Sequence, residues 1–356
     1  MDKFEFPKDF YWGAATSAHQ VEGNNHNDWS EWEKATNHPV SGRACDHYNR
    51  FREDFDIAKS LSHNAHRFSI EWSRIEPEEG KWDEKEITHY QEVINALRER
   101  GIEPFVTLWH WTLPLWVAKQ GGWENKKTIS DFARYCEKVT QSIQGIKFWI
   151  TLNEPDFYAR NSYLFGFRPP QKKSFFKFLK VFFHLIKAHK ISYTIIKKIG
   201  GFAGISQNNF YFNLFLNKTN KQQDFIGVNY YKYWNRGRIK NDMDWSIYPK
   251  GLYYVLRGLK KFNKPIYITE NGLADAKDEK RLSFIKEHIK WIAQAIKEGA
   301  DVRGYLYWSL LDNFEWDKGF YPRFGLVEMD YTTMKRIIRS SSFNYKKIIE
   351  ENSVEL

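Results

Sequence analysis

The chain has 356 residues, of which 42% are hydrophobic and 18% aromatic, and its formal net charge is +10. This length and composition allow a full core within one domain, because α/β barrels of this size are commonly a single unit. No run of roughly 18 apolar residues occurs, which excludes a membrane-spanning helix.

The chain begins with MDKFEFPKDFYWG. A charged start followed by an apolar stretch, the pattern of a secretory signal, is missing there, so we expect a cytoplasmic protein. Its two cysteines, Cys45 and Cys136, could form one bridge at most, and in a cytoplasm we expect reduced thiols. No low-complexity linker divides the chain, so residues 1–356 are expected to form a single domain.

Eight strand-like runs recur along the chain. They cover about residues 10–18, 65–72, 104–111, 147–154, 202–208, 225–231, 265–271 and 304–311. Most are near-continuous apolar runs, as in strands buried on both faces of a parallel sheet. Stretches with helical periodicity lie between them, for example residues 85–101 and 278–299. Eight strands alternating with helices predict a (β/α)8 barrel, the TIM barrel.

Two of these runs end on a carboxylate beside an amide. FWITL leads into Asn153 and Glu154, and PIYIT leads into Glu270 and Asn271. Each alone has a simpler interpretation, a helix cap in the first case and an Asn-Gly hairpin turn in the second. A carboxylate at the rim of an apolar core is costly unless it is hydrated, paired or used. Two such strand ends in one chain therefore suggest a functional pair.

The predicted barrel brings these two carboxylates together. Reactive groups in such barrels lie at the C-terminal ends of strands, and Glu154 and Glu270 end the fourth and seventh predicted strands. Strand ends three steps apart in an eight-stranded ring face each other across the mouth. Two converging carboxyl groups match the chemistry of glycoside hydrolysis, in which one donates a proton and the other is nucleophile or base.

Short motifs spread along the chain resemble one enzyme family. They are FYWGAATSAHQVEG, ACDHYNRFREDF, HRFSIEWSRIEP, LWHWTLP, TLNEP, DFIGVNYY, ITENG, GYLYWSLLDNFEW and GFYPRFGLVEMDY. As an ordered set over roughly residues 5–350, they resemble glycoside hydrolase family 1, the β-glucosidase family. TLNEP alone is a weaker sign, because other barrel glycosidases of the same clan also place Asn-Glu-Pro after the fourth strand.

The resemblance implies roles for the two carboxylates. Glu154 matches the acid/base and Glu270 the nucleophile, with Arg67 and Tyr231 supporting Glu270. Apolar neighbours and the negative charge of Glu270 would both raise the pKa of Glu154, which must start protonated. An arginine charge and a tyrosine hydrogen bond would favour the ionised form of Glu270. Once Glu270 is glycosylated, Glu154 should lose its proton more easily and serve as the base for water.

The same resemblance implies a sugar pocket that mixes amides, carboxylates and indoles. Its members are Gln20, His110, Trp111, Asn153, Asn229, Trp308, Glu315 and Trp316. Such a mixture suits a hexose, which offers hydroxyl edges and an apolar C–H face. Taken alone, His110 and Trp308 would be ordinary core residues. Asn153 is expected to reach the sugar 2-hydroxyl.

Three residues limit the expected substrates to non-phosphorylated β-O-glycosides and favour cleavage at the chain end, that is, exo attack. They are Glu315, Glu154 and Trp316. Glu315 can accept hydrogen bonds from an unmodified sugar but would repel a 6-phosphate. Glu154, where the thioglucosidase branch has glutamine, favours O-glycosides. A pocket closed by Glu315 and Trp316 favours exo attack by a β-glucosidase-like hydrolase.

Other classes remain open. A non-catalytic sugar-binding protein on the same barrel could keep the pocket, and an endo-glycanase of the same clan could share the two carboxylates. His63 and His66 lack the glutamate partner expected of a zinc protease, so we expect no metal and no cofactor. We expect small β-glycosides or oligosaccharides as ligands, and no nucleic acid. The preference among glucose, galactose and fucose is not visible in the sequence.

The chain is short for the family it resembles. Only about 16 residues separate the fifth strand, ending at Asn208, from the sixth, starting at Phe225, so helix 5 should be a remnant. The loop after the first strand and the loop after ENGLADA also look shortened. We therefore expect shallow subsites for the leaving group.

Residues 171–200 carry eight lysines and no acidic residue, which accounts for most of the net charge. Lysines and His184 recur every three or four residues as one stripe, and phenylalanines and aliphatic residues form a broader apolar arc. The simplest interpretation is helix 4 of the barrel with the arc inward and the stripe in water; a helix lying on a membrane surface fits the composition too. Because helix 5 is short, we predict a homo-oligomer contact or an open apolar cleft near residues 171–224.

Overall fold

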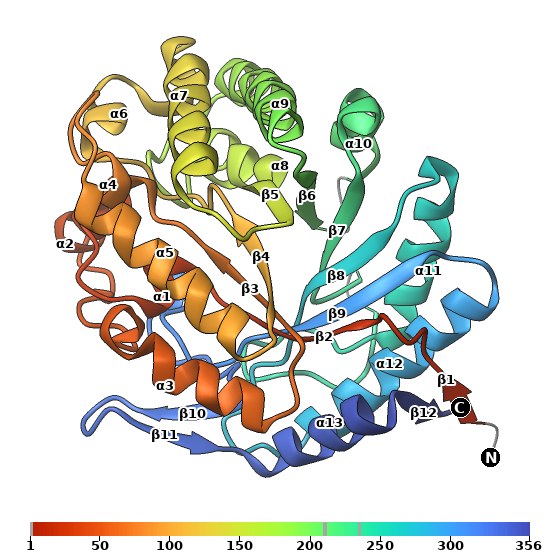
Figure 1. Ribbon diagram of the computed structural model, residues 1–356. Helices are drawn as coiled ribbons and strands as arrows, with labels where there is room; N and C mark the ends of the chain where they lie inside the picture. Colours follow the sequence, from red (N-terminus) through yellow and green to blue (C-terminus); the bar gives the residue numbers. More distant parts are fainter. Residues whose placement is uncertain (1–2, 209–211, 234–235) are drawn as a thin grey trace.

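In the computed structural model, which describes residues 3–208, 212–233 and 236–356, eight parallel strands close into one barrel (Figure 1). The strands are β2 (Tyr11–Ala15), β3 (Ala65–Ser69), β4 (Glu103–Thr107), β5 (Phe148–Asn153), β6 (Phe202–Asn208), β7 (Phe225–Tyr230), β8 (Ile266–Asn271) and β9 (Val302–Trp308). Each pairs with the next, and β9 pairs with β2 to close the ring, with Tyr11 opposite Gly304. The predicted (β/α)8 barrel is confirmed.

The barrel strands are buried along nearly their whole length. Every residue of β3, β5, β7 and β8 is buried, which explains why they appear in the sequence as continuous apolar runs rather than alternating ones. All eight predicted strands are present. The observed strands are shorter than several of the predicted runs because the chain turns out of the sheet at the barrel mouth.

One helix follows each barrel strand on the outside of the ring (Figure 1). These helices are α3 (His47–Ser60), α5 (Glu84–Glu99), α7 (Lys127–Ser142), α9 (Phe175–Lys198), α10 (Phe212–Thr219), α11 (Pro249–Leu259), α12 (Arg281–Lys297) and α13 (Ser340–Glu351). Short helices in the connections are α1 (Ala18–Val21), α2 (Asp28–Ala35), α4 (Trp72–Ile75), α6 (Leu115–Lys119), α8 (Pro155–Ala159) and the π-helical turn η2 (Arg160–Leu164). The 3-10 turns are η1 (Gly122–Glu124), η3 (Asn220–Gln222), η4 (Lys260–Phe262) and η5 (Trp316–Lys318).

Two small antiparallel pairs lie outside the barrel. β1 (Lys3–Glu5) pairs with β12 (Ser353–Glu355), and β10 (Val327–Asp330) pairs with β11 (Lys335–Ile338). The first pair joins the two ends of the chain (Figure 1). Strands this short carry too few residues to show a period in sequence, and neither pair was predicted.

Aromatic rings fill the barrel below its mouth. Phe105 and Phe148 stack with ring centroids 4.2 Å apart, and Tyr267 packs against both at 5.3 and 5.5 Å. Phe225 meets Tyr267 edge-on at 5.3 Å. These rings form a packed floor, as expected for a barrel whose interior is a core rather than a pore.

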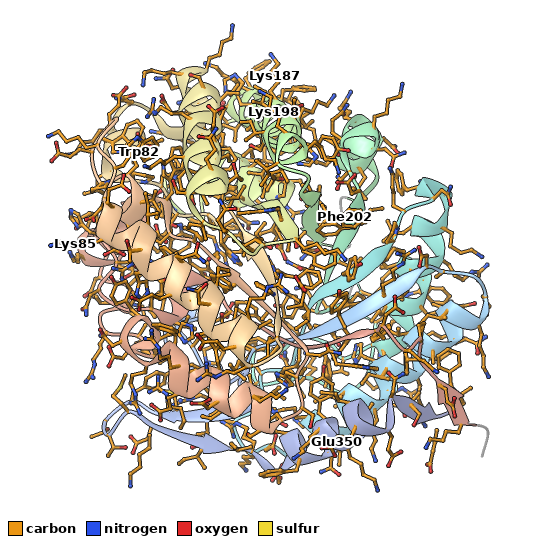
Figure 2. All side chains as sticks on the ribbon, in the orientation of Figure 1. Trp82, Lys85, Lys187, Lys198, Phe202 and Glu350 are labelled. Carbon is orange, nitrogen blue, oxygen red and sulfur yellow. The ribbon has the colours of Figure 1, made fainter. Side chains whose placement is uncertain are left out.

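The prediction for residues 171–200 was partly wrong. The helix forms as α9, but His184, assigned to the solvent stripe, is buried and its Nδ1 lies 2.8 Å from the carbonyl oxygen of Trp123. Phe176 and Phe183, assigned to the inner arc, are 82% and 45% exposed. The helix is rotated about its axis relative to the predicted orientation, so that His184 faces η1 and not water. Lys187 and Lys198 lie on the outer side of α9 (Figure 2).

The helix after β6 is short, as predicted. α10 has 8 residues against 24 in α9, and Phe215 of α10 packs on Phe182 of α9 with ring centroids 5.5 Å apart. Residues 209–211, within the segment predicted to replace helix 5, lie outside the described residues. A groove of about 640 Å³ runs between α7 and α9, with Ile129 and Ile191 among lysines in its walls. The oligomer contact stays a prediction.

Within residues 3–208, 212–233 and 236–356, no helix is both long enough and apolar enough to cross a bilayer.

Candidate active site

A cavity of about 490 Å³ opens at the C-terminal ends of the barrel strands. Ten of the predicted residues line it: Gln20, His110, Trp111, Asn153, Glu154, Tyr231, Glu270, Trp308, Glu315 and Trp316. They come from the ends or following loops of β2, β4, β5, β7, β8 and β9. Two further predicted residues, Arg67 and Asn229, lie directly behind this wall and bind the carboxylates in it.

Glu154 stands at the end of β5, where the backbone turns sharply into α8. Its φ is 44°, in the left-handed region that is uncommon for residues other than glycine, and Pro155 begins the helix. Burial, and secondarily the nearby charge of Glu270, raise the pKa of Glu154 well above its usual value. Asn229 Nδ2 donates a hydrogen bond to Glu154 Oε1 at 2.8 Å. Glu154 therefore has a neutral amide as its polar neighbour and keeps its proton near neutral pH.

Glu270, in β8, has a different environment. Arg67 from β3 forms an ion pair and hydrogen bond with Glu270 Oε1, and both side chains are buried. Tyr231 Oη donates to the other carboxylate oxygen, Oε2, at 2.7 Å. Burial, followed by the charge of Glu270, raises the pKa of Tyr231 well above its usual value, so the phenol stays a donor. Both oxygens of Glu270 thus accept bonds suited to a carboxylate.

A continuous hydrogen-bond path joins the two carboxyl groups. Arg67 Nη2 donates to Asn153 Oδ1 at 2.7 Å, and Asn229 Nδ2 donates to the same oxygen at 3.0 Å as well as to Glu154. Thr269 Oγ1 donates to Asn229 Oδ1 at 2.8 Å, which fixes the orientation of that amide. The burial of Arg67 costs little free energy, because carboxylate, amide and hydroxyl oxygens accept hydrogen bonds from its guanidinium group.

His110 and three tryptophans form an aromatic part of the wall. The His110 ring lies 6.2 Å from Trp308 and 6.0 Å from Trp316, both nearly parallel to it. Burial, then the charge of Arg67, lowers the pKa of His110 well below its usual value, so its imidazole is neutral. Its Nε2 lies 3.0 Å from Asn153 Nδ2 and accepts from that amide. Trp111 and Trp316 have left-handed backbones, with φ of 77° and 53°.

Glu315 adds a third carboxyl group to the lining of the cavity. Gln20 Nε2 donates to Glu315 Oε2 at 3.3 Å, and desolvation raises the pKa of Glu315 to about 8. Burial opposes the ionisation of neighbouring Asp317, but Arg168 and Lys318 overcome it and hold the pKa of Asp317 below its usual value. Arg168 Nη2 lies 3.3 Å from Asp317 Oδ1, and its guanidinium carbon lies 4.7 Å from the centre of the Trp111 ring. This part of the cavity therefore holds a protonated carboxyl beside an ionised one.

Comparison with known proteins identifies the family. The model of glycosyl hydrolase family 1 matches residues 2–211 and 209–354, nearly the whole chain. The chain belongs to glycosyl hydrolase family 1. Beta-glucosidase A of Thermotoga maritima is 33% identical to this family 1 glycosidase over 445 aligned positions, with 100% of both chains covered. The alignment therefore reaches from one end of the relative to the other, but this chain of 356 residues lacks internal segments that the relative has. The match to the family model is divided into two parts at residues 209–211, beside the short α10.

Solved structures give the same assignment. A beta-glycosidase from Pyrococcus horikoshii has a TM-score of 0.94 and 38% identity, covering 100% of this chain and 97% of that one. The beta-glucosidase from Thermotoga maritima in complex with glucoimidazole has a TM-score of 0.92 and 31% identity over 98% and 99% of the two chains. A 6-phospho-beta-glucosidase of Bacillus subtilis is also similar, at 29% identity over 99% of each chain. Family membership alone therefore leaves the sugar's phosphorylation open.

Sequence reasoning missed much of the outer cavity of this family 1 glycosidase. The additional lining residues are Phe157, Arg160, Arg168, Asn208, Lys232, Met243, Trp245, Asp317, Lys318, Tyr321, Pro322 and Phe324. Most lie in loops, where no strand or helix period marks which side chains point inward. Asp317 and Lys318 could have been found, because they directly follow the predicted Trp316. Among the described residues, no group of three or more His, Cys, Asp or Glu side chains is arranged to hold a metal ion.

Proposed function

We propose that this family 1 glycosidase is a retaining, exo-acting β-glycosidase of the β-glucosidase type that hydrolyses non-phosphorylated β-O-glycosides. The observation that carries the proposal is the contrast between two carboxyl groups in one cavity. Glu154 has a raised pKa and a neutral amide partner, whereas Glu270 is paired with Arg67 and hydrogen-bonded by Tyr231. An acid and a nucleophile need these two environments.

In the first step, the ionised Glu270 attacks the anomeric carbon and a glycosyl ester forms. Glu154 gives its proton to the departing glycosidic oxygen, so that the leaving group departs as a neutral alcohol. Arg67 and Tyr231 bind the two oxygens of Glu270 and hold them in place before attack. Asn153, fixed between Arg67, Asn229 and His110, is positioned to contact the sugar 2-hydroxyl.

In the second step, Glu154 acts as the base. Esterification removes the charge of Glu270, which is one of the two main causes that raise the pKa of Glu154. Glu154, which gave its proton to the leaving group in the first step, therefore stays ionised more easily. It accepts a proton from an incoming water, and the water attacks the anomeric carbon as the ester bond to Glu270 breaks. Two inversions at one carbon give net retention of the β configuration.

The surroundings of Glu315 support an unmodified sugar. A phosphate dianion beside Glu315 would also lie near Asp317, which its cationic neighbours keep ionised. Since Arg168 and Lys318 already contact Asp317, an added phosphate would compete with it for their charge. Glu315, whose pKa burial raises to about 8, can both donate to and accept from sugar hydroxyls. We also propose that residues 1–356 act as one catalytic domain.

The experiment that tests this function traps the glycosyl ester. A fluorinated glucoside that slows the second step should add one sugar to the protein, and peptide mass spectrometry should locate it on Glu270. NMR of the first product from an aryl β-glucoside should show the β anomer. An α anomer as first product would contradict retention. Binding of glucosides without any release of the aryl alcohol would instead favour a non-catalytic sugar-binding protein.

A further inference from the structure

The cavity carries cationic side chains that the proposed hydrolysis does not use. Its lining contains four cations, Arg160, Arg168, Lys232 and Lys318. Arg168 and Lys318 both contact Asp317, at 3.3 and 2.9 Å. The other two, Arg160 and Lys232, lie in a different part of the wall, where burial and, secondarily, the charge of Arg160 lower the pKa of Lys232.

Arg160 and Lys232 lie on the side of the cavity where the leaving group departs. Arg160 directly follows α8, the helix that Glu154 caps, and the charges of Glu154 and Asp156 act on its guanidinium. Lys232 follows Tyr231, the hydrogen-bond donor to Glu270. A leaving group lies between the acid carboxyl and solvent, because Glu154 must reach its glycosidic oxygen. Arg160 and Lys232 are therefore placed to meet the aglycone and not the sugar.

Two carboxyl groups, Asp156 and Glu154, act on the charge of Arg160. Burial raises the pKa of Asp156 to about 7, and Glu154 keeps its proton until the leaving group takes it. Glu270 is already paired with Arg67. Arg160 and Lys232 bring two cationic side chains to this part of the cavity wall, in a chain whose net charge is +10.

Aromatic faces accompany these cations. The guanidinium carbons of Arg160 and Arg168 lie 5.5 and 5.3 Å from the centre of the Phe157 ring, and Lys232 Nζ lies 5.3 Å from the centre of Trp245. Trp245 packs in turn against Tyr231, with ring centroids 5.9 Å apart. An aglycone in contact with Phe157 or Trp245 would thus meet an aromatic face with a cation beside it.

We propose that this side of the cavity selects β-glycosides whose leaving group combines an aromatic or apolar body with an anionic group. The inference rests on the proposed β-glycosidase activity and deepens it by naming the class of aglycone. Phe157 and Trp245 take the body, and Arg160 and Lys232 attract the anion. The sugar itself remains uncharged, so this preference is separate from recognition of a 6-phosphate beside Glu315.

The test compares two substrates that differ only in this charge. A carboxyphenyl β-glucoside and its methyl ester are hydrolysed by the wild type and by Lys232→Gln, and kcat/KM is measured from the released phenol. The ratio of the two kcat/KM values in each protein is compared, so that the intrinsic reactivity of each phenol cancels. Lys250→Gln is the matched control, because Lys250 Nζ lies 5.2 Å from the centre of the Trp291 ring in a separate groove.

Lys232→Gln should lower the anionic-to-ester ratio by about threefold to fivefold, the effect of one partly exposed charge pair. Lys250→Gln should leave the ratio at its wild-type value. The loss caused by Lys232→Gln should shrink at high salt, where exposed charges are screened. Equal ratios in wild type and Lys232→Gln would overturn the proposal while leaving the β-glycosidase function intact. Failure of wild type to hydrolyse either substrate would overturn both.

Discussion

Asn229 donates a hydrogen bond from Nδ2 to Glu154 Oε1 at 2.8 Å, and it is the strongest favourable influence on the ionised form of that carboxyl. Burial and the charge of Glu270 act in the opposite direction and prevail. The pKa of Glu154 is therefore a balance between desolvation and one amide hydrogen bond. Since a general acid works only while protonated, this balance should set the alkaline side of the pH profile.

Asn229→Ala should move that alkaline limb to higher pH. The amide stabilises the carboxylate, so its loss raises the pKa of Glu154, and the enzyme keeps its acid protonated over a wider range. One hydrogen bond of this kind corresponds to a shift of about half to one pH unit. The measurement is kcat/KM against pH with an aryl β-glucoside. A limb that stays in place or moves down would show that Glu154 is not the group that titrates.

Glu154→Ala should reduce turnover in proportion to how much the leaving group needs a proton. Alkyl glucosides should lose about 10²–10⁴-fold in kcat/KM, and nitrophenyl glucosides, whose phenols leave readily as anions, should lose far less. Glu270→Ala is the matched comparison and should abolish turnover of both kinds, because no glycosyl ester can form. Equal losses on both substrates for Glu154→Ala would argue against its role as acid.

Arg67→Met should destabilise the fold through the charge that it leaves behind. Glu270 would be buried without its cation, and breaking such a pair lowers the free energy of unfolding by about 3–5 kcal/mol. Adding Glu270→Gln to Arg67→Met should recover part of this loss, because the uncompensated charge is removed. Urea unfolding of the two single variants and the double variant measures the coupling. Additive losses would mean that the pair contributes little.

Gly272→Ala should damage the site although the change is only one methyl group. A Cβ at Gly272 would lie 1.8 Å from the carbonyl oxygen of Trp308, so the backbones that carry Glu270 and Trp308 would have to separate. We expect loss of both kcat/KM and stability.

Gly258→Ala is the control for this substitution. Nothing lies within 4 Å of a Cβ there, in the last turn of α11, so the variant should gain about 0.5–1 kcal/mol and keep its activity. Thermal unfolding and aryl glucoside hydrolysis of both variants check the contrast.

The barrel and the inner cavity could be predicted from the sequence because short segments of the chain carry the signals for them. A strand buried on both faces must be apolar throughout, as in β7 (Phe225–Tyr230), and a polar residue at its end is conspicuous. The connections gave no such signal. Lys232 and Trp245 reach the cavity from a long loop, and His184 is inward only because η1 lies against α9. The orientation of these residues depends on tertiary contacts that have no period along the chain.

The pairing of β1 with β12 makes the chain nearly circular. Lys3 lies opposite Glu355 in register, Lys3 Nζ also forms an ion pair with Glu351 at 3.2 Å, and Trp12 Nε1 donates to Asn352 Oδ1 at 2.9 Å. These contacts lie where β2 begins, at the barrel end opposite the cavity. A few added residues could link the two ends and allow the polypeptide to be opened elsewhere, for example at Asn263 between α11 and β8. Such a circular permutant would keep all eight barrel strands intact, and a tag joined to β1 or β12 would point away from the substrate.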